Sequence, residues 1–365
     1  MLENKPIEKM EGKNKRLNVL MITRAYGERA GGMERLSWEL ARELDKSGKV
    51  SLKLLAHRGS RATSPLFIIK GLIVGMWKAR KADVIFLGDP LLSIIGWLLR
   101  KMLHKPIAIT VHGLDVIYPN LFYQWYLKKL GLNFDLYLPI SQYTSTLLTR
   151  LKVSGKIVVI NPGVDDRYYD SSIEQNSLTK VLGVNVRGKK ILLTVGRLQI
   201  RKGHEWLIRN VLPKLDKNVV YVIAGSGKEE AQIRAAVRES GMSHRVIMLG
   251  RAKVGALKVL YNTADIFVQP NIKIAGDAEG FGLVLLEASL CGLPIVASKM
   301  EGITDAIREG QNGWLVEAEN EKAWSKAISI ILAGSQKQIP ARQFTRDHYD
   351  WTKQVEKYIT ALSEL

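Results

Sequence analysis

Short apolar runs alternate with amphipathic stretches along most of the chain. Apolar runs bounded by turn residues indicate strands, and the amphipathic stretches between them, such as Met33–Lys46, indicate helices. Strands that alternate with helices predict parallel sheets. The first series of predicted strands comprises Asn18–Thr23, Ser51–His57, Ala82–Leu87, Pro106–Val111, Leu136–Ile140 and Ile157–Ile160.

A second series of apolar runs begins near Lys189, after a polar stretch from Asp165 to Gly188 without strong periodicity. Because the alternation stops and then restarts, the sequence predicts two domains joined by a linker. The last segment, Ala341–Leu365, is predicted to be helical, with Trp351 and Tyr358 as anchors. The second series of predicted strands comprises Ile191–Val195, Val219–Ala224, Val246–Leu249, Ile266–Gln269 and Pro294–Ala297.

Composition agrees with two cores. The chain has 365 residues, 46% of them hydrophobic, and domains of roughly 100–200 residues are usual. Its one cysteine, Cys291, excludes an intrachain disulfide, suits a reducing cytosol and is interpreted as core packing. No apolar run reaches the roughly 18–20 residues that span a bilayer. The predicted parts are a disordered charged tail (1–16), an N-terminal Rossmann-like domain (17–165), a linker (166–188), a C-terminal Rossmann-like domain (189–340) and a C-terminal helix (341–365).

Two glutamates lie eight positions apart, one in the glycine-rich turn 279–282 (E-G-F-G) and one in the apolar run Leu283–Leu290. The run predicts a helix packed against a sheet. Glycines at its start leave backbone N–H groups free at a helix N-terminus, where anions and hydroxyl-rich ligands dock. Glu279 and Glu287 therefore suit a ligand with two separated polar parts, such as a sugar and a ribose joined by a diphosphate. An ordinary turn and a solvated glutamate would give the same short motif.

A basic loop follows the predicted strand Ile191–Val195. Arg197 and Lys202 flank this strand-to-helix connection. In a parallel sheet such loops lie at the carboxyl ends of the strands, where ligands bind. Two cations there suit a diphosphate, because Arg offers a planar fork and Lys a mobile charge. A solvated basic loop is the alternative in a chain with 54 Lys and Arg residues.

Glycines and one histidine mark other predicted strand ends. Gly31 and Gly32 follow the first predicted strand, where they would let the backbone approach a phosphate closely or simply make a loop flexible. His112 comes directly after Pro106–Val111 and is placed to bind a sugar hydroxyl or to stabilise developing charge, although a lone histidine is often structural. Asp115, three residues later, would contact the acceptor, orient His112 or cap a helix.

The order of these motifs carries a resemblance to a known family. The second half contains V-G-R-L, R-K-G, A-G-S-G, A-D-I-F-V-Q-P-N, E-G-F-G, L-L-E-A and C-G-L-P-I-V-A-S, and the first half contains G-G-M-E, V-H-G-L-D and I-N-P-G-V-D. This series resembles glycosyltransferase family 4, a large family of retaining enzymes with the two-domain GT-B fold. The resemblance covers nearly the whole chain from about Leu17, and it is specific for the superfamily but not for the substrate.

The resemblance implies a fold and a set of site residues. The fold would be GT-B, an α/β architecture of two Rossmann-like parallel-sheet domains facing a central cleft, with the C-terminal helix crossing back to the N-terminal domain. Glu279 would contact donor-sugar hydroxyls, Glu287 would bind ribose hydroxyls, and the segment Met248–Gly250 would border the base. Asp115 would lie on the acceptor side. The implied catalytic residues are Arg197, Lys202, Glu279 and His112, and the implied donor-binding residues are Gly31, Gly32, Gly225, Gly250, Gly280, Phe281, Gly282 and Glu287.

The sequence predicts neither a metal site nor a cofactor beyond the donor substrate. It contains no D-x-D motif, no zincin pattern and no cluster of Cys and His. Arg197, Lys202 and amides near Gly31 and Gly32 would instead carry the charge of the leaving diphosphate. The family's usual proposal then applies: the acceptor hydroxyl attacks from the face that the diphosphate leaves, and a leaving oxygen takes the proton.

The net charge of +19 suits a polyanionic partner. Pro65–Lys81 and Leu91–Lys105 each combine apolar residues and tryptophan with basic residues, as interfacial helices do. Buried helices with basic C-terminal ends show the same pattern. We expect an anionic membrane surface to bind the N-terminal domain. Nucleic acid is not expected, because no recognised binding motif is present and aromatic residues make up only 7% of the chain.

These features predict a metal-independent retaining hexosyltransferase, cytoplasmic and peripheral on the inner face of the cell membrane. It would move a hexose from GDP-mannose or a UDP-hexose to a glycolipid, a lipid-linked sugar or a polysaccharide in cell-envelope glycan synthesis. The R-K-G and H-G-L-D segments resemble those of mannosyltransferases in the family, although both donors fit equally well on physical grounds. Two alternatives stay open. One is a non-catalytic nucleotide-sugar-binding or membrane-docking protein on the same fold, and the other is a sugar-phosphate synthase or phosphorylase with a soluble substrate.

Overall fold

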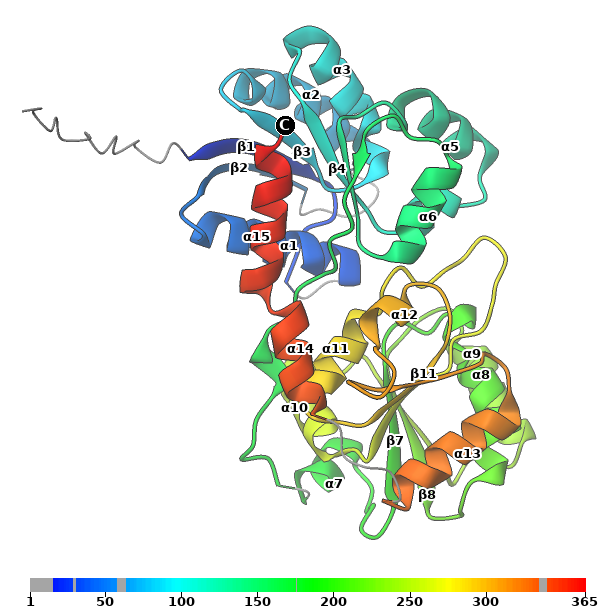
Figure 1. Cartoon of the computed structure of the whole chain (residues 1–365). Helices are drawn as coiled ribbons and strands as arrows, with labels where there is room; N and C mark the ends of the chain where they lie inside the picture. The colour runs from blue at the N-terminus through cyan, green and yellow to red at the C-terminus, as the bar shows by residue number, and fades with distance from the viewer. Residues whose placement is uncertain (1–15, 29–30, 58–63, 175, 335–339) are drawn as a thin grey trace, which may run out of the picture.

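The protein consists of two α/β domains, one above the other in Figure 1. The computed structural model describes residues 16–28, 31–57, 64–174, 176–334 and 340–365. Each domain is built on a six-stranded parallel sheet with helices on both faces. The α/β fold class predicted from the sequence is confirmed. The predicted tail, residues 1–16, lies outside the described residues except for Arg16.

The N-terminal sheet has the strand order β2-β1-β3-β4-β5-β6, and all neighbouring strands run parallel. The order reverses at β1, which pairs with both β2 and β3. Ligands of open parallel sheets bind at such a reversal, beyond the carboxyl ends of the strands. The strands are β1 (Leu17–Thr23), β2 (Val50–Ala56), β3 (Val84–Leu87), β4 (Ile107–Val111), β5 (Leu136–Pro139) and β6 (Lys156–Ile157).

The C-terminal sheet has the order β12-β11-β10-β7-β8-β9, also parallel throughout. Its reversal lies at β7, between β8 and β10, so the loops after β7 and β10 face one crevice. The strands are β7 (Lys190–Val195), β8 (Val219–Ala224), β9 (Val246–Gly250), β10 (Ile266–Gln269), β11 (Ile295–Ser298) and β12 (Trp314–Val316).

Helices cover both faces of the N-terminal sheet because successive strand residues point to opposite faces and both faces are apolar. In β1, Met21 belongs to the core that includes residues of α1, whereas Leu20 and Ile22 belong to the core shared with α2 and α3. The helices are α1 (Gly32–Lys46), α2 (Ser64–Ala79), α3 (Ser93–Leu103), α4 (Leu114–Ile117), α5 (Leu121–Tyr126) and α6 (Gln142–Arg150), with short turns at Pro90–Leu92 and Leu127–Gly131.

The C-terminal sheet is covered in the same way, with α10 and α11 contributing to one face and α8, α9 and α13 to the other. The helices are α7 (Asn176–Leu182), α8 (His204–Trp206), α9 (Glu230–Glu239), α10 (Val254–Thr263), α11 (Leu283–Leu290), α12 (Ile303–Ala306) and α13 (Glu321–Leu332), with short helical turns at Asp166–Tyr168, Ile200–Lys202, Leu207–Val211 and Leu212–Lys214.

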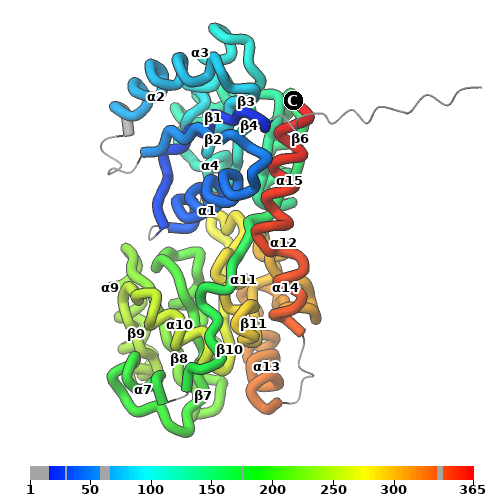
Figure 2. The backbone as a smooth tube through the Cα atoms, turned by 90° about the vertical axis from the view of Figure 1, so that its left-hand side faces the viewer, coloured from blue at the N-terminus to red at the C-terminus, as the bar shows by residue number. Residues whose placement is uncertain are grey.

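The C-terminal segment returns to the N-terminal domain, as predicted. Figure 2 shows α14 (Ala341–Tyr349) beside the lower domain and α15 (Trp351–Ser363) beside the upper one. Asp350 separates the two helices, and its side chain caps α15 by accepting from Thr352 N. The Trp351 indole donates to Glu39 of α1 at 3.0 Å. α15 therefore closes one face of the N-terminal sheet.

The structure adds two elements that the sequence prediction did not include. The strand Trp314–Val316 was not predicted, because three residues are too short to give a periodic signal. The stretch predicted to be the interdomain linker contains a helix, Asn176–Leu182, which packs against α10 of the C-terminal domain. No helix within the described ranges is long and apolar enough to cross a bilayer.

Candidate active site

Glu279 lies on the loop between β10 and α11. Its carboxylate contacts two cations, Arg201 and Lys202, from the loop after β7. Its Oε2 accepts hydrogen bonds from Lys202 Nζ at 2.5 Å, Arg201 at 2.8 Å and Asn271 Nδ2 at 3.3 Å. The side chain is only 12% exposed. Because the donors come from the loops after β7 and β10, the reversal of strand order is what brings them together.

Burial and the neighbouring cations act in opposite directions on these groups. Burial alone would raise the pKa of Glu279, but Lys202 and Arg201 outweigh it and lower that pKa to about 2. Burial lowers the pKa of Lys202, whereas Glu279 raises it. We assign the charged form to Lys202 at neutral pH, because its Nζ is in short contact with a carboxylate that stays ionised there.

Arg201 was not singled out from the sequence. Its guanidinium binds Glu279 and also Asp277, the latter at 3.0 Å, and the side chain is buried. The turn Ile200–Lys202 ends at Gly203, whose φ of +63° suits glycine. A Cβ atom there would lie 1.8 Å from the carbonyl oxygen of Pro270. The signal was the adjacent pair Arg201-Lys202, of which the sequence interpretation used only one member.

Arg197 differs from Arg201 in being exposed and making no ion pair or hydrogen bond with the described residues. It lies at the domain boundary, since a Cβ added to Gly31 would be 3.9 Å from Arg197 Cζ. A Cβ added to Gly32 would likewise be 3.9 Å from Leu283 Cδ1. The N-termini of α1 and α11 therefore meet across the two domains, close to an unpaired cation.

His112 touches the same boundary from the N-terminal domain. Its imidazole Nε2 lies 2.9 Å from the carbonyl oxygen of Gly88, and this contact fixes Nε2 as the protonated nitrogen. The backbone carbonyl of His112 faces Gly280, where an added Cβ would lie 2.1 Å from that oxygen. Gly280 thus lets the predicted acceptor-side and donor-side loops approach each other closely.

Asp115 holds the loop that carries His112. Its two carboxylate oxygens accept from the His112 backbone N–H at 3.1 and 2.9 Å. Burial raises the pKa of Asp115, while His112 lowers it. Of the roles considered for Asp115, the structure shows the one of orienting the His112 segment.

Asp89, on the loop after β3, is a buried acid that the sequence interpretation did not include. It directly follows Gly88, caps the turn Pro90–Leu92 and binds Arg24 Nε at 2.9 Å. Its Oδ2 is buried and has no hydrogen-bond partner within the described part of the chain. The signal in the sequence was G-D-P at the end of the third predicted strand.

Glu287 lies in α11 and is buried, but it is engaged differently from Glu279. One carboxylate oxygen contacts Arg35 of α1, in the other domain, and the second accepts from the Tyr261 hydroxyl at 2.8 Å. Arg35 also binds Glu39 at 2.8 Å. Both oxygens proposed for ribose hydroxyls are therefore occupied by protein groups in this conformation.

Most of the remaining residues predicted to bind the donor are glycines, which offer only main-chain atoms to a ligand. Gly225 packs so closely that an added Cβ would lie 1.7 Å from the Gly196 carbonyl oxygen. Gly250 ends β9 with φ of +65° and open space around it, and Gly282 precedes α11 with φ of +94°. The Phe281 ring is buried against Tyr349. These glycines build the loops, whatever ligand they contact.

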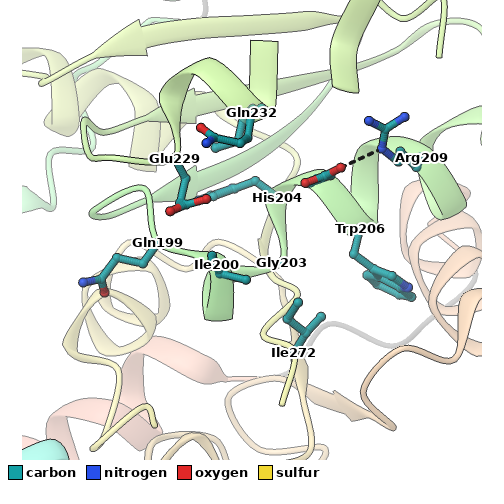
Figure 3. A pocket seen from close by; sticks show the side chains of 11 residues that line it. Gln199, Ile200, Gly203, His204, Trp206, Arg209, Glu229, Gln232 and Ile272 are labelled. Carbon is teal, nitrogen blue, oxygen red and sulfur yellow. Dashed lines mark hydrogen bonds and ion pairs between the residues drawn. The ribbon is translucent and has the colours of Figure 1, made fainter. Parts of the chain in front are cut away.

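A pocket of about 250 Å³ adjoins the basic loop (Figure 3). Trp206, Ile200 and Ile272 supply apolar walls, and Glu229, Gln199 and Gln232 supply polar ones. No residue predicted to bind the donor lines it. In the described part of the chain, no group of three or more His, Cys, Asp and Glu side chains is arranged to hold a metal ion.

Two family descriptions match the chain and together cover most of it. Residues 30–168 match "Glycosyltransferase Family 4", and residues 183–348 match "Glycosyl transferases group 1". The first region contains β2 to β6 of the N-terminal sheet, and the second contains all six strands of the C-terminal sheet.

Curated relatives align at low identity. The GDP-mannose-dependent alpha-(1-6)-phosphatidylinositol monomannoside mannosyltransferase of Mycolicibacterium smegmatis is 27% identical over 71% of this chain and 70% of its own. The D-inositol 3-phosphate glycosyltransferase of Corynebacterium jeikeium is 28% identical over 74% of this chain and 70% of its own. An uncharacterised glycosyltransferase of Methanocaldococcus jannaschii is 32% identical, but the match spans only 45% of its length.

Solved structures share the fold over nearly the whole chain. Sucrose-phosphate synthase from Thermosynechococcus elongatus has a TM-score of 0.78 at 19% identity, covering 96% of this chain and 99% of that one. Anabaena HepE in complex with UDP-glucose has a TM-score of 0.75 at 20% identity, covering 96% and 100%. At these identities the likeness shows the GT-B fold alone.

Proposed function

Since the chain belongs to glycosyltransferase family 4, we propose that it is a retaining hexosyltransferase that takes its sugar from a nucleotide-diphosphate donor. The observation that carries this proposal is the meeting of two helix N-termini, from different domains, beside Arg197, which has no ion-pair partner among the described residues. Backbone N–H groups and the positive ends of both helices face this point, and together they form a site suited to a diphosphate.

The donor sugar would bind next to that diphosphate. Glu279 would accept hydrogen bonds from sugar hydroxyls, since its ionised carboxylate is fixed by Lys202 and Arg201. The amides of Gly280 to Gly282 would contact the same sugar. Because the backbone of His112 already touches Gly280, an acceptor in the N-terminal domain would reach the anomeric carbon from the His112 side.

The nucleoside would extend along the C-terminal domain. The base would border Met248–Gly250, and ribose hydroxyls would bind Glu287 in place of the Arg35 guanidinium. This exchange requires α1 and α11 to separate slightly, because Arg35 and Glu287 are in direct contact. Donor binding would therefore be coupled to domain opening.

Transfer would retain the configuration of the sugar. The acceptor hydroxyl oxygen forms the new bond to the anomeric carbon on the face where the bond to the diphosphate oxygen breaks. The acceptor proton passes to that leaving oxygen. Arg197, Lys202 and the amides near Gly31 and Gly32 would stabilise the charge that develops on the diphosphate, so we propose that no metal is required.

We propose GDP-mannose or a UDP-hexose as donor and a lipid-linked or polysaccharide hydroxyl as acceptor. GDP-mannose is supported by the relative from Mycolicibacterium smegmatis, whose name also gives a phosphatidylinositol mannoside as the molecule it acts on. UDP-hexoses are supported by Anabaena HepE in complex with UDP-glucose. A soluble acceptor, as for a sugar-phosphate synthase, would be the outcome if only free sugar phosphates accept the hexose.

A peripheral place on the inner face of the membrane fits the surface of the N-terminal domain. Four large apolar side chains of α2 are more than half exposed and share one helical face: Leu66, Ile69, Ile73 and Trp77. Basic residues follow at the end of the helix and just after it, Lys78, Arg80 and Lys81. This combination favours an anionic lipid surface. The other segment considered, on α3, is different, because Ile95 and Leu99 are buried.

A thermal-shift panel tests the donor site. GDP, UDP and ADP, each with its common hexose conjugates, would be added without metal and again with EDTA. A ligand that binds only the folded state raises the melting temperature. We expect one base to give a clear shift that EDTA leaves unchanged. A shift that EDTA abolishes would contradict the metal-free site, and no shift with any donor would contradict the donor proposal.

Arg197→Ala gives the matching activity test. The side chain is exposed and unpaired, so its loss leaves the fold intact while removing one cation from the diphosphate site. We expect turnover to fall by roughly 10²-fold or more. Lys217→Ala, another exposed cation of the same domain, serves as the control. Equal turnover in both variants would remove Arg197 from the site.

A further inference from the structure

The segment Tyr118–Trp125 exposes a cluster of large apolar side chains that the sequence patterns did not reveal. Leu121 is 90% exposed, Phe122 74%, Trp125 55% and Tyr118 53%. Helix α5 within this segment buries none of its six residues. Such a concentration of aromatic and aliphatic surface is unusual on a soluble face and marks a binding site.

The segment is held in a defined shape. The Phe122 and Trp125 rings lie 5.8 Å apart, and Tyr118 meets Tyr123 edge to face at 6.2 Å. Asn120 caps α5 by accepting from the Tyr123 backbone N–H at 2.9 Å. The rings are thus presented outward by ordered backbone.

Hydrogen bonds connect this segment to the acceptor side of the candidate site. The Tyr123 hydroxyl donates to the backbone oxygen of Asp115 at 2.5 Å, and Asp115 in turn holds the His112 loop. On the other side, Pro119 packs against Gly276, where an added Cβ would lie 2.9 Å from Pro119 Cγ. Gly276 belongs to the loop that carries Glu279. The exposed rings therefore lie near the boundary at which both domains meet.

Charge supports a lipid as the occupant. Exposed Lys128 and Lys129 directly follow α5, and the whole chain carries +19. Apolar and aromatic side chains next to lysines are the composition of surfaces that enter the boundary between acyl chains and anionic headgroups. Amphipathic rings such as Trp125 and Tyr118 favour that boundary.

We propose that Tyr118–Trp125 inserts into an anionic lipid surface and receives the lipid part of an amphipathic acceptor, whose polar end then reaches His112. This proposal rests on the proposed transferase function and names its acceptor class. The α2 face attaches the domain to the membrane, whereas the α5 segment binds the acceptor where it leaves the membrane. α3 lies between the two, packed against α2 and against the turn Leu127–Gly131.

Vesicle binding tests the insertion independently of catalysis. An environment-sensitive dye would be attached at Leu121→Cys in a Cys291→Ala background, with Lys326→Cys on α13 of the other domain as the control. The vesicles contain phosphatidylcholine with phosphatidylglycerol, or phosphatidylcholine alone. We expect a blue shift of the dye at position 121 on the anionic vesicles and none at position 326. No shift at position 121 would overturn the proposal.

An acceptor pair tests the lipid site itself. Dodecyl α-mannoside and methyl α-mannoside share a head group and differ only in the alkyl chain. We expect the wild type to have a KM for the dodecyl acceptor lower by roughly tenfold or more. Leu121→Ser/Phe122→Ser should lose this preference, and Ile69→Ser/Ile73→Ser on α2 should keep it with these water-soluble acceptors.

The vesicle experiment and the acceptor experiment together distinguish a failure of the lipid-acceptor proposal from a failure of the proposed function. Equal KM values for both mannosides in the wild type, or a preference that survives Leu121→Ser/Phe122→Ser, would overturn the lipid-acceptor proposal while transfer itself proves the enzyme. If the wild type transfers sugar to neither mannoside from GDP-mannose or UDP-glucose, the proposed function is at fault. The vesicle result then still decides whether the segment enters a lipid surface.

Discussion

Glu279 and Glu287 are eight residues apart and only 12% and 4% exposed, yet they are held in opposite ways. Glu279 is fixed within its own domain, by Lys202 and Arg201 from the neighbouring loop. Glu287 is fixed across the domains, by Arg35 of α1. The first arrangement is independent of domain closure, whereas the second exists only when the domains are closed. Under the proposed roles, Glu279 would form a sugar site that is ordered in either conformation, and Glu287 would form a nucleoside site that depends on the conformation.

The comparison also explains why the donor-binding role proposed for Glu279 is better supported than the one proposed for Glu287. A carboxylate with two cations can still accept from sugar hydroxyls with its second oxygen, Oε1, to which no partner among the described residues is assigned. Glu287 has both oxygens engaged, by Arg35 and Tyr261. The proposed binding of ribose at Glu287 would therefore have to displace a protein group.

Replacing Glu279 should have the largest effect. Glu279→Gln keeps the shape but removes the charge that orders Lys202 and Arg201, and we expect kcat/KM to fall by roughly 10³-fold. Steady-state transfer assays with the donor identified by thermal shift measure this. Asp277→Asn, which removes the other acidic partner of Arg201, is the matched control and should cost much less. A Glu279→Gln enzyme with wild-type turnover would show that the cluster is only structural.

The second-largest effect is expected on stability, when the ion pair between Arg35 and Glu287 is broken. Arg35→Ala leaves the buried Glu287 carboxylate without its cation, and we expect a loss of about 3 kcal/mol in the free energy of unfolding. Denaturant unfolding gives the value. Arg42→Ala on the same helix, partly exposed and paired with Glu43, should change it by less than about 1 kcal/mol. Equal losses in both variants would show that the Arg35–Glu287 contact contributes nothing special.

The loss of unfolding free energy at low pH should depend on Glu279. Its pKa is depressed from 4.5 to about 2 on folding, so its contribution is present above pH 4.5 and is lost as the pH falls toward 2. The shift corresponds to about 3 kcal/mol across that window, of which only part is lost by pH 3. Unfolding curves between pH 6 and pH 2.5 measure it. Glu279→Gln should reduce the loss of unfolding free energy between pH 6 and pH 2.5. An unchanged pH dependence would refute the assignment of this loss to Glu279.

The smallest effect is expected at the second partner of Glu287. Tyr261→Phe removes one buried hydrogen bond and keeps the ring, and we expect a loss of about 1–2 kcal/mol in unfolding free energy. If ribose competes with Arg35 at Glu287, donor affinity in Tyr261→Phe should fall less than in Glu287→Gln. Calorimetric titration with the donor compares the two, and the reverse order would argue against ribose at Glu287.

Much of the candidate site follows from local patterns. The strands before Gly31, Arg197 and Gly225 were predicted because buried parallel strands are continuous apolar runs, and parallel sheets place the following loops at one edge. The convergence of Lys202 and Glu279 follows from that geometry once the fold class is known. Arg201 was missed only because two adjacent cations gave no criterion for choosing between them.

The tertiary structure alone decided what each amphipathic segment does. Two segments with the same mixture of apolar and basic residues, on α2 and α3, behave differently because α3 is packed beneath its neighbours while α2 turns Ile69, Ile73 and Trp77 outward. The exposed α5 segment gave no periodic signal, since six residues are less than two helical turns.

The sequence by itself determined the fold class, the loops that face the cleft and most of the residues on them, because these depend on neighbours within a strand-turn-helix unit. Contacts across the domains were decided by the tertiary structure. Arg35 and Glu287 are 252 positions apart, and no local pattern relates them. The partner of a buried charge depends on which surfaces meet when the chain closes, and that is a property of the packed domains.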